Sequence, residues 1–466
     1  MAVAGAGAVR SRPLRAAGRD NPDVIVIGAG MSGLYTAMLL EEQGARVLVV
    51  EGQNRIGGRV ITLDDVPGKP EAGPTGFSGM YARTLDVCEQ LKVPLERPVR
   101  YRDGHEAKDM IHIKGTNILH EEWEKHPLNP LPEVHKKFLP FLAMYQILLK
   151  YNFLSGLEDW IEPQFHQYDV PTFDFLRSKG ISEEALNLLD IGMFTGGMRR
   201  TSLLHDMRIS HWLVYGGEAV LAGAKHVVGG TQRLPEAMAG ALKSEIRLGM
   251  PVVQIALGEA GAEVRCADDT IYRSKFVVST APFTVLRHIV IDPSPPPHQR
   301  EAIDTMPYLE SVKVFMVPER PYWRDDGLPP GMWTDTPIES IRAVAHGDGD
   351  TVSNIYVDIS GIGARPFAFM AEKDIGAYAL SWIEKLRPSA KGALKVAKII
   401  DKGRAPFSLG DWAYWNVGQV ARFGQTVRDP WGRLHFAGDG TAIMNRGVEA
   451  AMESGERAAQ EIIARL

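Results

Sequence analysis

The chain has 466 residues, enough for two or three domains, and its 45% hydrophobic and 23% charged residues are typical of a soluble globular enzyme. A net charge of −5 gives no reason to expect nucleic acid or an anionic membrane, and no apolar run reaches the ~18 residues that span a bilayer. The two cysteines, Cys88 and Cys266, are too few for a disulfide framework, which favours a reducing compartment and predicts a cytoplasmic protein.

The first twenty residues differ in composition from the rest of the chain. They contain four arginines and no acidic residue before Asp20. This composition is compatible with a transit peptide, but the segment lacks an apolar core and a twin-arginine pair. We therefore expect 1–20 to be a disordered leader, with a targeting role as the alternative.

A nucleotide-binding fingerprint follows at 24–59, where a strand, a Gly-x-Gly-x-x-Gly turn, a helix and a second strand are predicted. Gly28 permits the turn, Gly30 lets the backbone approach a pyrophosphate, and Gly33 lets the helix pack closely on the strand. The second strand ends at Glu51, whose carboxylate suits the 2′-hydroxyl of an unphosphorylated ribose. The fingerprint therefore predicts NAD or FAD and does not choose between them.

Strand patterns cluster in three separated places, at 23–51, 246–281 and 434–437. A sheet built from both ends of the chain must be discontinuous. We therefore predict an α/β (α+β overall) fold, in which a Rossmann-like domain faces a second, mixed-sheet and helical substrate domain across a cleft. The expected boundaries are 21–84, 225–300 and 405–466 for the nucleotide-binding domain, and 85–224 and 301–404 for the substrate-binding domain.

Metal and hydrolase chemistry are poorly supported. The segment LHEEWEKH has Glu124 where a zinc helix motif needs its second histidine. His205 and His211 are six residues apart and do not share a helix face. No serine lies in a nucleophile elbow, so neither a metal site nor a serine hydrolase is expected.

Four further motifs complete the pattern. They are IGGR at 56–59, HVVGGTQRLPEAM at 226–238, LHFAGDGT at 434–441 and GVEAAMESGERAA at 447–459. Together with the fingerprint, they make the chain from about residue 21 onward resemble the FAD-dependent amine oxidase family. This family includes monoamine, polyamine and L-amino-acid oxidases, so the resemblance implies FAD as the cofactor.

The resemblance implies positions along the whole cofactor. Val252 would contact the adenine through its backbone, and Gly438 and Asp439 would lie along the ribityl chain. The last helix, which opens at Val448, would direct its positive N-terminal dipole at the N1/O2 edge of the flavin. The cofactor set is Gly28, Gly30, Met31, Ser32, Gly33, Glu51, Gly57, Gly58, Arg59, Thr75, Gly76, Val252, Gly438, Asp439 and Val448.

The segment SVKVFMV at 311–317 predicts a strand with a lysine inside it. Alternation places Lys313 on the face of Ser311 and Phe315, and both faces are largely apolar, so we expect a buried lysine. A lysine at a sheet edge that points to solvent is the alternative. The spacing to Trp323 matches the family's lysine, and the resemblance implies that Lys313 is catalytic, holds a water at flavin N5 and assists the reaction with oxygen.

The sequence departs from the family at the flavin link and the substrate cage. Mitochondrial monoamine oxidases attach FAD to a cysteine, whereas the matching position here is Gly410, which predicts non-covalent FAD. The two aromatic rings that frame the amine would fall near Asp411 and at Gly447, so the usual cage is expected to be absent. Nearby aromatic residues remain available to line the site, with burial in the core as the alternative. The expected substrate contacts are Trp212, Tyr414, Trp415 and Gly447.

These features predict a flavin-dependent oxidase of amines. A hydride equivalent would leave the carbon that bears the amine, the imine would hydrolyse to a carbonyl, and oxygen would be reduced to hydrogen peroxide. The apolar middle region favours a hydrophobic primary or secondary amine. The alternatives are an FAD-dependent dehydrogenase or desaturase with another electron acceptor, and a non-catalytic FAD-binding scaffold. Candidates for binding a substrate carboxylate are Arg199, Arg200, Arg208 and Arg446, each more simply explained as a surface or structural ion pair.

Overall fold

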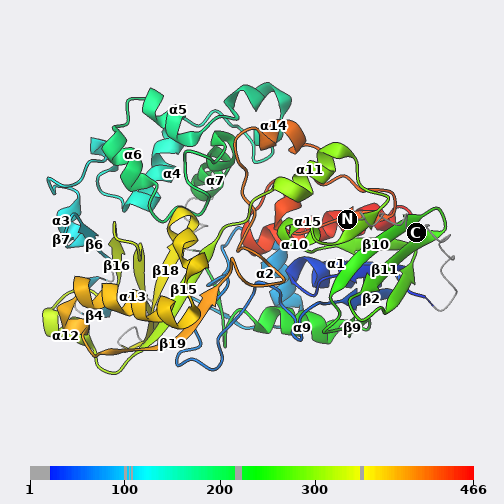
Figure 1. Ribbon diagram of the computed structural model, residues 1–466, viewed down its shortest axis with the longest axis horizontal. Coiled ribbons are helices and arrows are strands. Elements are labelled where there is room, and N and C mark those ends of the chain that lie inside the picture. The colour runs from blue at the N-terminus through cyan, green and yellow to red at the C-terminus, as the bar shows by residue number, and fades with distance from the viewer. Residues whose placement is uncertain (1–20, 99–101, 104, 107–108, 216–222, 347–350) are drawn as a thin grey trace, which may run out of the picture.

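The computed structural model describes residues 21–98, 102–103, 105–106, 109–215, 223–346 and 351–466 (Figure 1). The leader predicted at 1–20 lies outside these residues. In the part of the chain that the structure describes, no helix is both long and apolar enough to cross a membrane. The apolar helix α4 (Pro140–Lys150) packs on helix α7 (Leu203–Tyr215) inside the protein.

A parallel sheet of five strands, in the order β20-β13-β1-β2-β9, forms the nucleotide-binding domain. The strands come from near the start, the middle and the end of the chain, which confirms the predicted discontinuous Rossmann-like fold. Two helices, α1 and α15, pack against each other beside this sheet (Figure 1). The bounds are β1 (Val24–Ile27), β2 (Val47–Val50), β9 (Glu245–Arg247), β13 (Phe276–Ser279), β20 (Leu434–Phe436), α1 (Met31–Glu42) and α15 (Gly447–Ile463).

A smaller sheet covers the other face of the parallel sheet, in the order β12-β11-β10-β14. Ile25 and Val277 of the parallel sheet share a core with Ile255 and Val264 of the smaller sheet. Burial on both faces explains why the parallel strands are apolar throughout and do not alternate. The bounds are β10 (Val252–Gly258), β11 (Gly261–Cys266), β12 (Ile271–Ser274) and β14 (Val290–Asp292).

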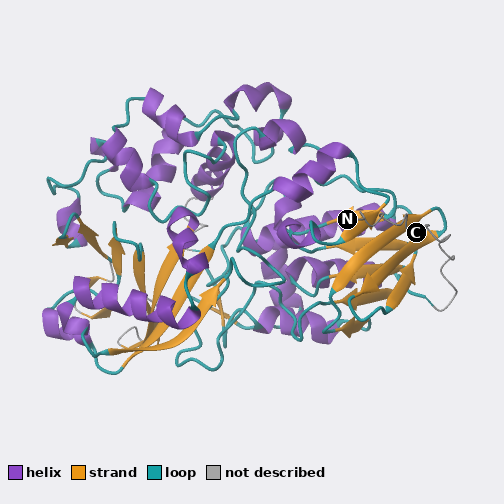
Figure 2. Ribbon diagram, in the orientation of Figure 1, coloured by secondary structure: helices purple, strands orange, loops and turns teal. Residues whose placement is uncertain are grey.

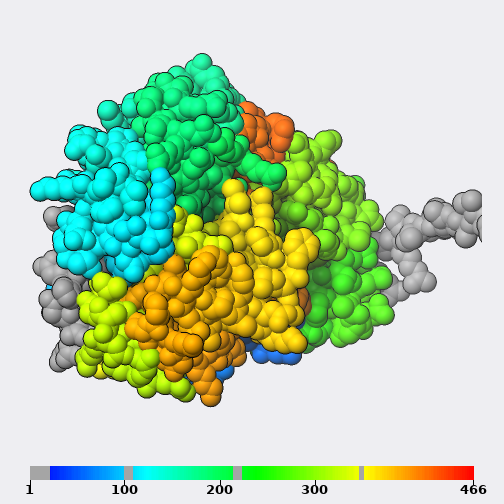
Figure 3. Space-filling model, turned by 60° about the vertical axis from the view of Figure 1, so that its left-hand side comes forward, coloured from blue at the N-terminus to red at the C-terminus, as the bar shows by residue number. Residues whose placement is uncertain are grey.

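The second domain is built on a mixed sheet of seven strands, in the order β19-β15-β18-β17-β16-β6-β7. Figure 2 shows these strands as a group apart from those of the nucleotide-binding domain. In Figure 3 the helical segments, in cyan and green, lie over the yellow and orange part of this domain. The strands are β6 (Met110–Ile113), β7 (Thr116–Ile118), β15 (Ser311–Pro318), β16 (Met332–Thr334), β17 (Ser340–His346), β18 (Thr351–Ser360) and β19 (Leu394–Asp401), and the main helices besides α4 and α7 are α5 (Thr172–Ser178), α6 (Glu183–Leu189) and α13 (Glu372–Leu386).

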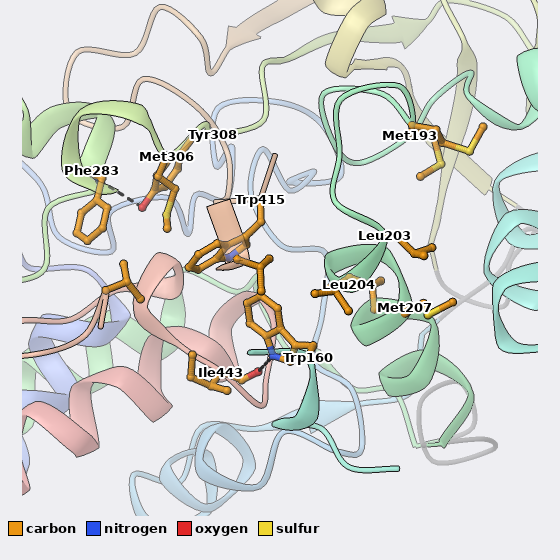
Figure 4. Close-up of a cluster of buried hydrophobic side chains, with 14 of the residues drawn as sticks. Trp160, Met193, Leu203, Leu204, Met207, Phe283, Met306, Tyr308, Trp415 and Ile443 are labelled. Atoms are coloured by element: carbon orange, nitrogen blue, oxygen red, sulfur yellow. Dashed lines mark hydrogen bonds between the residues drawn. The ribbon is translucent and has the colours of Figure 1, made fainter. Parts of the chain in front are cut away.

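The predicted fold class is therefore confirmed, whereas the domain boundaries stay predictions. A cluster of buried side chains joins the helical layer to the C-terminal segment (Figure 4). Trp160 packs edge-on against Trp415, with ring centroids 5.2 Å apart, and its indole N–H donates to the carbonyl of Ile443 at 3.0 Å. This cluster fixes the start of α15 relative to the helices of the second domain.

Gly33 explains how α1 approaches the turn that precedes it so closely. A Cβ atom at Gly33 would lie 1.9 Å from the carbonyl oxygen of Gly28. We expect Gly33→Ala to lower the free energy of unfolding by about 2 kcal/mol, because the overpacked helix must shift.

Chemical denaturation of the apoprotein measures this effect, and Gly240 offers a matched control. Gly240 lies in helix α9 (Arg233–Ala241), where a Cβ atom would meet nothing within 4 Å. Gly240→Ala should therefore raise the free energy of unfolding by up to ~1 kcal/mol. Equal stability of the two alanine variants would contradict the close packing of α1.

Candidate active site

A single cavity of about 430 Å³ collects most of the residues singled out in the sequence. Glu51 and Val252 line it at the carboxyl edge of the parallel sheet, and Lys313 lines it from β15. Gly33 is not on its wall and instead packs against Gly28. The predicted cofactor residues on the wall are Gly28, Gly30, Met31, Ser32, Glu51, Gly57, Gly58, Arg59, Thr75, Gly76, Val252, Gly438, Asp439 and Val448.

Glu51 is held at the end of β2 by two backbone donors. Its carboxylate accepts hydrogen bonds from the N–H groups of Ala29 and Gln53, both at 2.8 Å. The residue is only 6% exposed, so its orientation is fixed before any ligand binds. Each carboxylate oxygen keeps a further lone pair, which fits the two hydroxyl donors of a ribose.

The start of α1 provides a place for an anion. Gly30 caps this helix without a side-chain hydrogen bond, so the N–H groups of the first turn remain open to the cavity. Gly58 approaches from the other side, and a Cβ atom there would lie 3.2 Å from the Cα atom of Gly30. The uncapped helix end and the narrow glycine-lined space fit a pyrophosphate.

The motif at 226–238 holds the segment with the Gly-Gly-Arg turn in place, a role that the sequence did not reveal. Glu71 accepts hydrogen bonds from the N–H of Thr231 at 2.7 Å and from its hydroxyl at 2.6 Å. Thr62 donates to the same carboxylate at 3.0 Å. Gln232 donates to the carbonyl of Ile56 at 3.2 Å, which anchors the Gly-Gly-Arg turn.

Arg59 and Asp439 form an ion pair with an N–O distance of 2.5 Å. Arg59 also donates to the carbonyl of Asp411 at 2.5 Å, and Asp439 accepts from the N–H of Ala413 at 2.9 Å. Burial opposes the charge of Arg59, but the adjacent carboxylate outweighs burial and raises the pKa of the guanidinium. The ion pair therefore connects the Gly-Gly-Arg turn at 56–59 with the loop at 438–441 along the cavity wall.

Lys313 lies inside the sheet and not at its edge. Strand β15 pairs with β18 on one side and with β19 on the other, so the solvent-pointing alternative is wrong. Lys313 is 8% exposed, stands opposite Asp358 in the strand register, and has its ammonium 5.6 Å from the ring centroid of Tyr356. Burial disfavours the ammonium, but Asp358 and the other acidic neighbours outweigh it and raise the pKa of Lys313. The acidic neighbours therefore favour the charged form of Lys313 on the cavity wall.

A second buried lysine, Lys402, lies just after β19 and was not singled out in the sequence. It is 2% exposed, and its Nζ has no hydrogen-bond partner among the described residues. Burial lowers the pKa of Lys402 from 10.5 to about 8, although Asp411 opposes the shift.

Lys402→Met is expected to raise the free energy of unfolding at pH 7 by on the order of 3 kcal/mol, because an unpaired buried charge is removed. Below pH 8 the lysine is charged in both the folded and the unfolded protein, so its burial lowers the free energy of unfolding by the full amount. Between pH 8 and 10.5 the unfolded state binds more protons, so the native protein gains stability as the pH rises and the difference from the variant disappears. Urea denaturation at pH 7 and above pH 10.5 measures the difference, with the exposed Lys395→Met as the control. If Lys402→Met raised the free energy of unfolding equally at both pH values, this explanation would be contradicted.

Two of the four expected substrate residues, Trp415 and Gly447, lie on the cavity wall. The other two lie behind it. The ring of Trp212 packs against Tyr81 with centroids 5.9 Å apart, and the hydroxyl of Tyr414 lies against Gly196. Contact of any of the four with a substrate stays a prediction.

Tyr81 occupies the space that the missing cage ring would need. Gly447 has a left-handed φ of +61°, and a Cβ atom there would lie 2.7 Å from the hydroxyl of Tyr81. Tyr81 lines the cavity and precedes helix α2 (Ala82–Gln90). Sequence reasoning missed it because nothing in its local pattern connects it with the start of α15.

The helical layer adds three further polar side chains. The sequence placed Tyr145 in a buried helix, dismissed His205 as a metal ligand, and offered Arg208 as a candidate for binding a carboxylate. Tyr145 of α4 and His205 and Arg208 of α7 all line the cavity. Phe194 and Trp412 add apolar surface. Among the residues that the structure describes, no group of three or more histidine, cysteine or acidic side chains is placed to hold a metal.

The parallel sheet, the open end of α1 and the buried carboxylate of Glu51 are the arrangement expected of a nucleotide-binding protein, and the second domain lines the same cavity through Lys313. Residues 31–463 match the model of the flavin containing amine oxidoreductase family, and the chain belongs to this family. It is therefore a flavin-dependent enzyme that oxidises amines.

Proteins similar in sequence or in structure match nearly the whole of this chain. An L-amino-acid oxidase of Mus musculus is 27% identical over 94% of this chain and 70% of its own length. A flavin-containing amine oxidase B of Sus scrofa is 26% identical over 95% of this chain and 86% of its own. A triple mutant of putrescine oxidase, from a redesign of cofactor binding, has a TM-score of 0.79 at 25% identity over 96% of this chain and 99% of that chain. Cyclohexylamine oxidase from Brevibacterium oxydans IH-35A, at 21% identity over 96% of this chain and 99% of its own, has a TM-score of 0.78 and supports the fold alone.

Proposed function

We propose that the flavin is FAD, held without a covalent bond, and that the enzyme oxidises an apolar amine with oxygen as the electron acceptor. The observation that carries this proposal is the single cavity on which Lys313 and all the predicted cofactor residues except Gly33 lie together. Separate groups of residues support the choice of FAD, the non-covalent binding and the apolar substrate.

The adenosine end of the cavity favours FAD over a flavin without an adenylate. Glu51 and the backbone at Val252 are adjacent, because the N–H of Met250 donates to the carbonyl of Glu51 at 2.8 Å. A cofactor without adenine and its ribose would leave both positions without a ligand. The open end of α1 lies next along the wall and supplies donors for a pyrophosphate.

The positions of the cysteines support non-covalent binding. Cys88 and Cys266 are both buried, and neither lines the cavity. The position that matches the linking cysteine, Gly410, has no room for a side chain, since a Cβ atom would lie 2.4 Å from the Cβ atom of Tyr308. Acid precipitation tests this point: the yellow colour should remain in the supernatant, and colour in the protein pellet would contradict it.

The bound flavin would accept the hydride equivalent that leaves the carbon next to the amine nitrogen. Trp412, Trp415 and Tyr81 provide walls that exclude water. An apolar wall lowers the pKa of a substrate amine, so the amine is held in its neutral, reactive form. The positive charge of Lys313 orients a water molecule and stabilises negative charge that develops on oxygen. The imine product then hydrolyses to a carbonyl compound.

A peroxide-coupled screen tests the proposal with primary, secondary and aromatic amines, polyamines and amino acids. We expect hydrogen peroxide with apolar amines and little with polyamines. Amines that bleach the flavin without peroxide formation in air would instead identify a dehydrogenase with another electron acceptor.

A further inference from the structure

Two arginines on the cavity wall near the start of α15 lie within hydrogen-bond distance of no carboxylate among the residues that the structure describes. Arg446 immediately precedes this helix, and its guanidinium lies 5.8 Å from the ring centroid of Trp212. Arg208 of α7 is 5% exposed, lies 4.8 Å from the ring centroid of Trp160, and donates to the carbonyl of Asn445. Neither guanidinium forms an ion pair with any residue that the structure describes.

The carboxylates nearest to Arg446 along the chain are already occupied. Glu449 accepts hydrogen bonds from Arg83 and from the N–H and hydroxyl of Thr84. Glu453 accepts from the backbone N–H groups of residues 443–445. The described residues therefore leave Arg446 without a carboxylate in an ion pair, while Glu453 partly offsets the charge of Arg208. Burial is the main cause of a pKa of Arg208 lowered to about 10; the carboxylate of Glu453 opposes this shift, and the charge of Arg446 reinforces it.

The cofactor pyrophosphate is in the wrong place to neutralise this charge. Ser454 of α15 lies 3.4 Å from Ser32 at the start of α1, where the pyrophosphate is expected. Arg446 precedes Ser454 by eight residues, which corresponds to about 12 Å along a helix. The two arginines therefore lie beyond the pyrophosphate, toward Gly447 and the substrate side.

Polar groups beside the arginines complete a site for an anion. His205 is 4% exposed and lines the cavity, and its Nδ1 has no hydrogen-bond partner among the described residues. Burial, together with Arg208 and Arg446, lowers the pKa of His205 and keeps the ring neutral. The phenol of Tyr145 lines the same region. The other two arginines considered from the sequence are exposed: Arg199 pairs with Glu183, and Arg200 is not on the wall.

We propose that Arg446, with Arg208 and His205, binds a carboxylate carried by the substrate, so that the amine is an amino acid with an apolar side chain. This inference rests on the proposed function and narrows its substrate class. The apolar walls of Trp415 and Tyr81 would receive the side chain, and a guanidinium would pair with the carboxylate in two parallel hydrogen bonds.

Binding of benzoate to the flavin-loaded protein tests the site without turnover. Benzoate should perturb the visible flavin spectrum at lower concentration than benzamide, which has the same shape without the charge. Arg446→Gln should weaken benzoate binding by about tenfold or more, because a charge-assisted pair is lost, and weaken benzamide binding far less. Arg446→Lys should recover part of the affinity, and the exposed Arg200→Gln should match the parent protein.

A kinetic comparison of phenylalanine with 2-phenylethylamine, which lacks only the carboxylate, gives the second test. The parent enzyme should prefer phenylalanine, and Arg446→Gln should raise the KM for phenylalanine by a much larger factor than the KM for 2-phenylethylamine. An unchanged KM with an altered flavin reduction potential would instead assign Arg446 to the flavin and overturn the proposal.

The two proposals fail in different ways. Arg446-dependent benzoate binding in a protein that oxidises no amine would contradict the proposed function and leave the anion site standing. Equal affinity for benzoate and benzamide, or benzoate binding that is unaffected by Arg446→Gln, would overturn the carboxylate site even if amines are oxidised.

Discussion

Replacing Lys313 with methionine is expected to slow the reaction of reduced flavin with oxygen by about 10²-fold or more, while the flavin stays bound. Oxygen acquires negative charge as it is reduced, and a buried cation stabilises that charge more than water can. Lys313 is suited to this role because it is buried in the middle of a sheet, and Asp358 and its other acidic neighbours keep it charged.

Stopped-flow mixing of the reduced enzyme with oxygen measures this effect, and flavin content is measured on the same samples. Lys398→Met is the matched control, since Lys398 lies on the neighbouring strand β19 and pairs with Asp65 at the surface. The control should react with oxygen like the parent enzyme. An unchanged rate in Lys313→Met would remove the residue from the oxygen reaction.

Glu51→Ala is expected to raise the dissociation constant of FAD by about 10²-fold or more, so that the purified variant is nearly colourless. The substitution removes the acceptor for the ribose hydroxyls, and it also releases the N–H groups of Ala29 and Gln53. Both effects act on the same loop. The increase in the dissociation constant of FAD should therefore be larger than the increase caused by the loss of any single backbone contact.

Titration of the apoprotein with FAD, followed by the quenching of flavin fluorescence, gives the dissociation constant. Glu245→Ala is a suitable control, because Glu245 is exposed on the adjacent strand β9 and pairs with Arg247. The control should bind FAD normally. Tight FAD binding by Glu51→Ala would show that the cofactor does not use the end of β2.

The nucleotide-binding half of the cavity could be predicted from the sequence because its determinants are local. Gly28, Gly30 and Glu51 belong to one continuous strand, turn, helix and strand, whose geometry follows from glycine positions and buried strands. Lys313 could also be placed, because strand alternation and its apolar neighbours require burial.

The substrate half could not be predicted in the same way, because it is assembled from distant segments. Tyr81, His205 and Arg446 precede or belong to three different helices. Arg446 was one of four arginines considered from the sequence, whereas the local patterns of Tyr81 and His205 do not connect them with the cavity. Only the packing of those helices brings them to one wall. The same packing places Trp212 and Tyr414 behind that wall, although the sequence predicts them at the substrate.

The central claim is that the cavity holds FAD and that the enzyme transfers electrons from an amine to oxygen. The most direct measurement is to mix the flavin-loaded protein with apolar amines and amino acids without oxygen, and then to admit oxygen and determine hydrogen peroxide. The flavin should bleach with at least one of these compounds, recover its colour in air, and yield peroxide in an amount equal to the amine consumed. A flavin that stays oxidised with every amine, or that bleaches and does not react with oxygen, would contradict the claim.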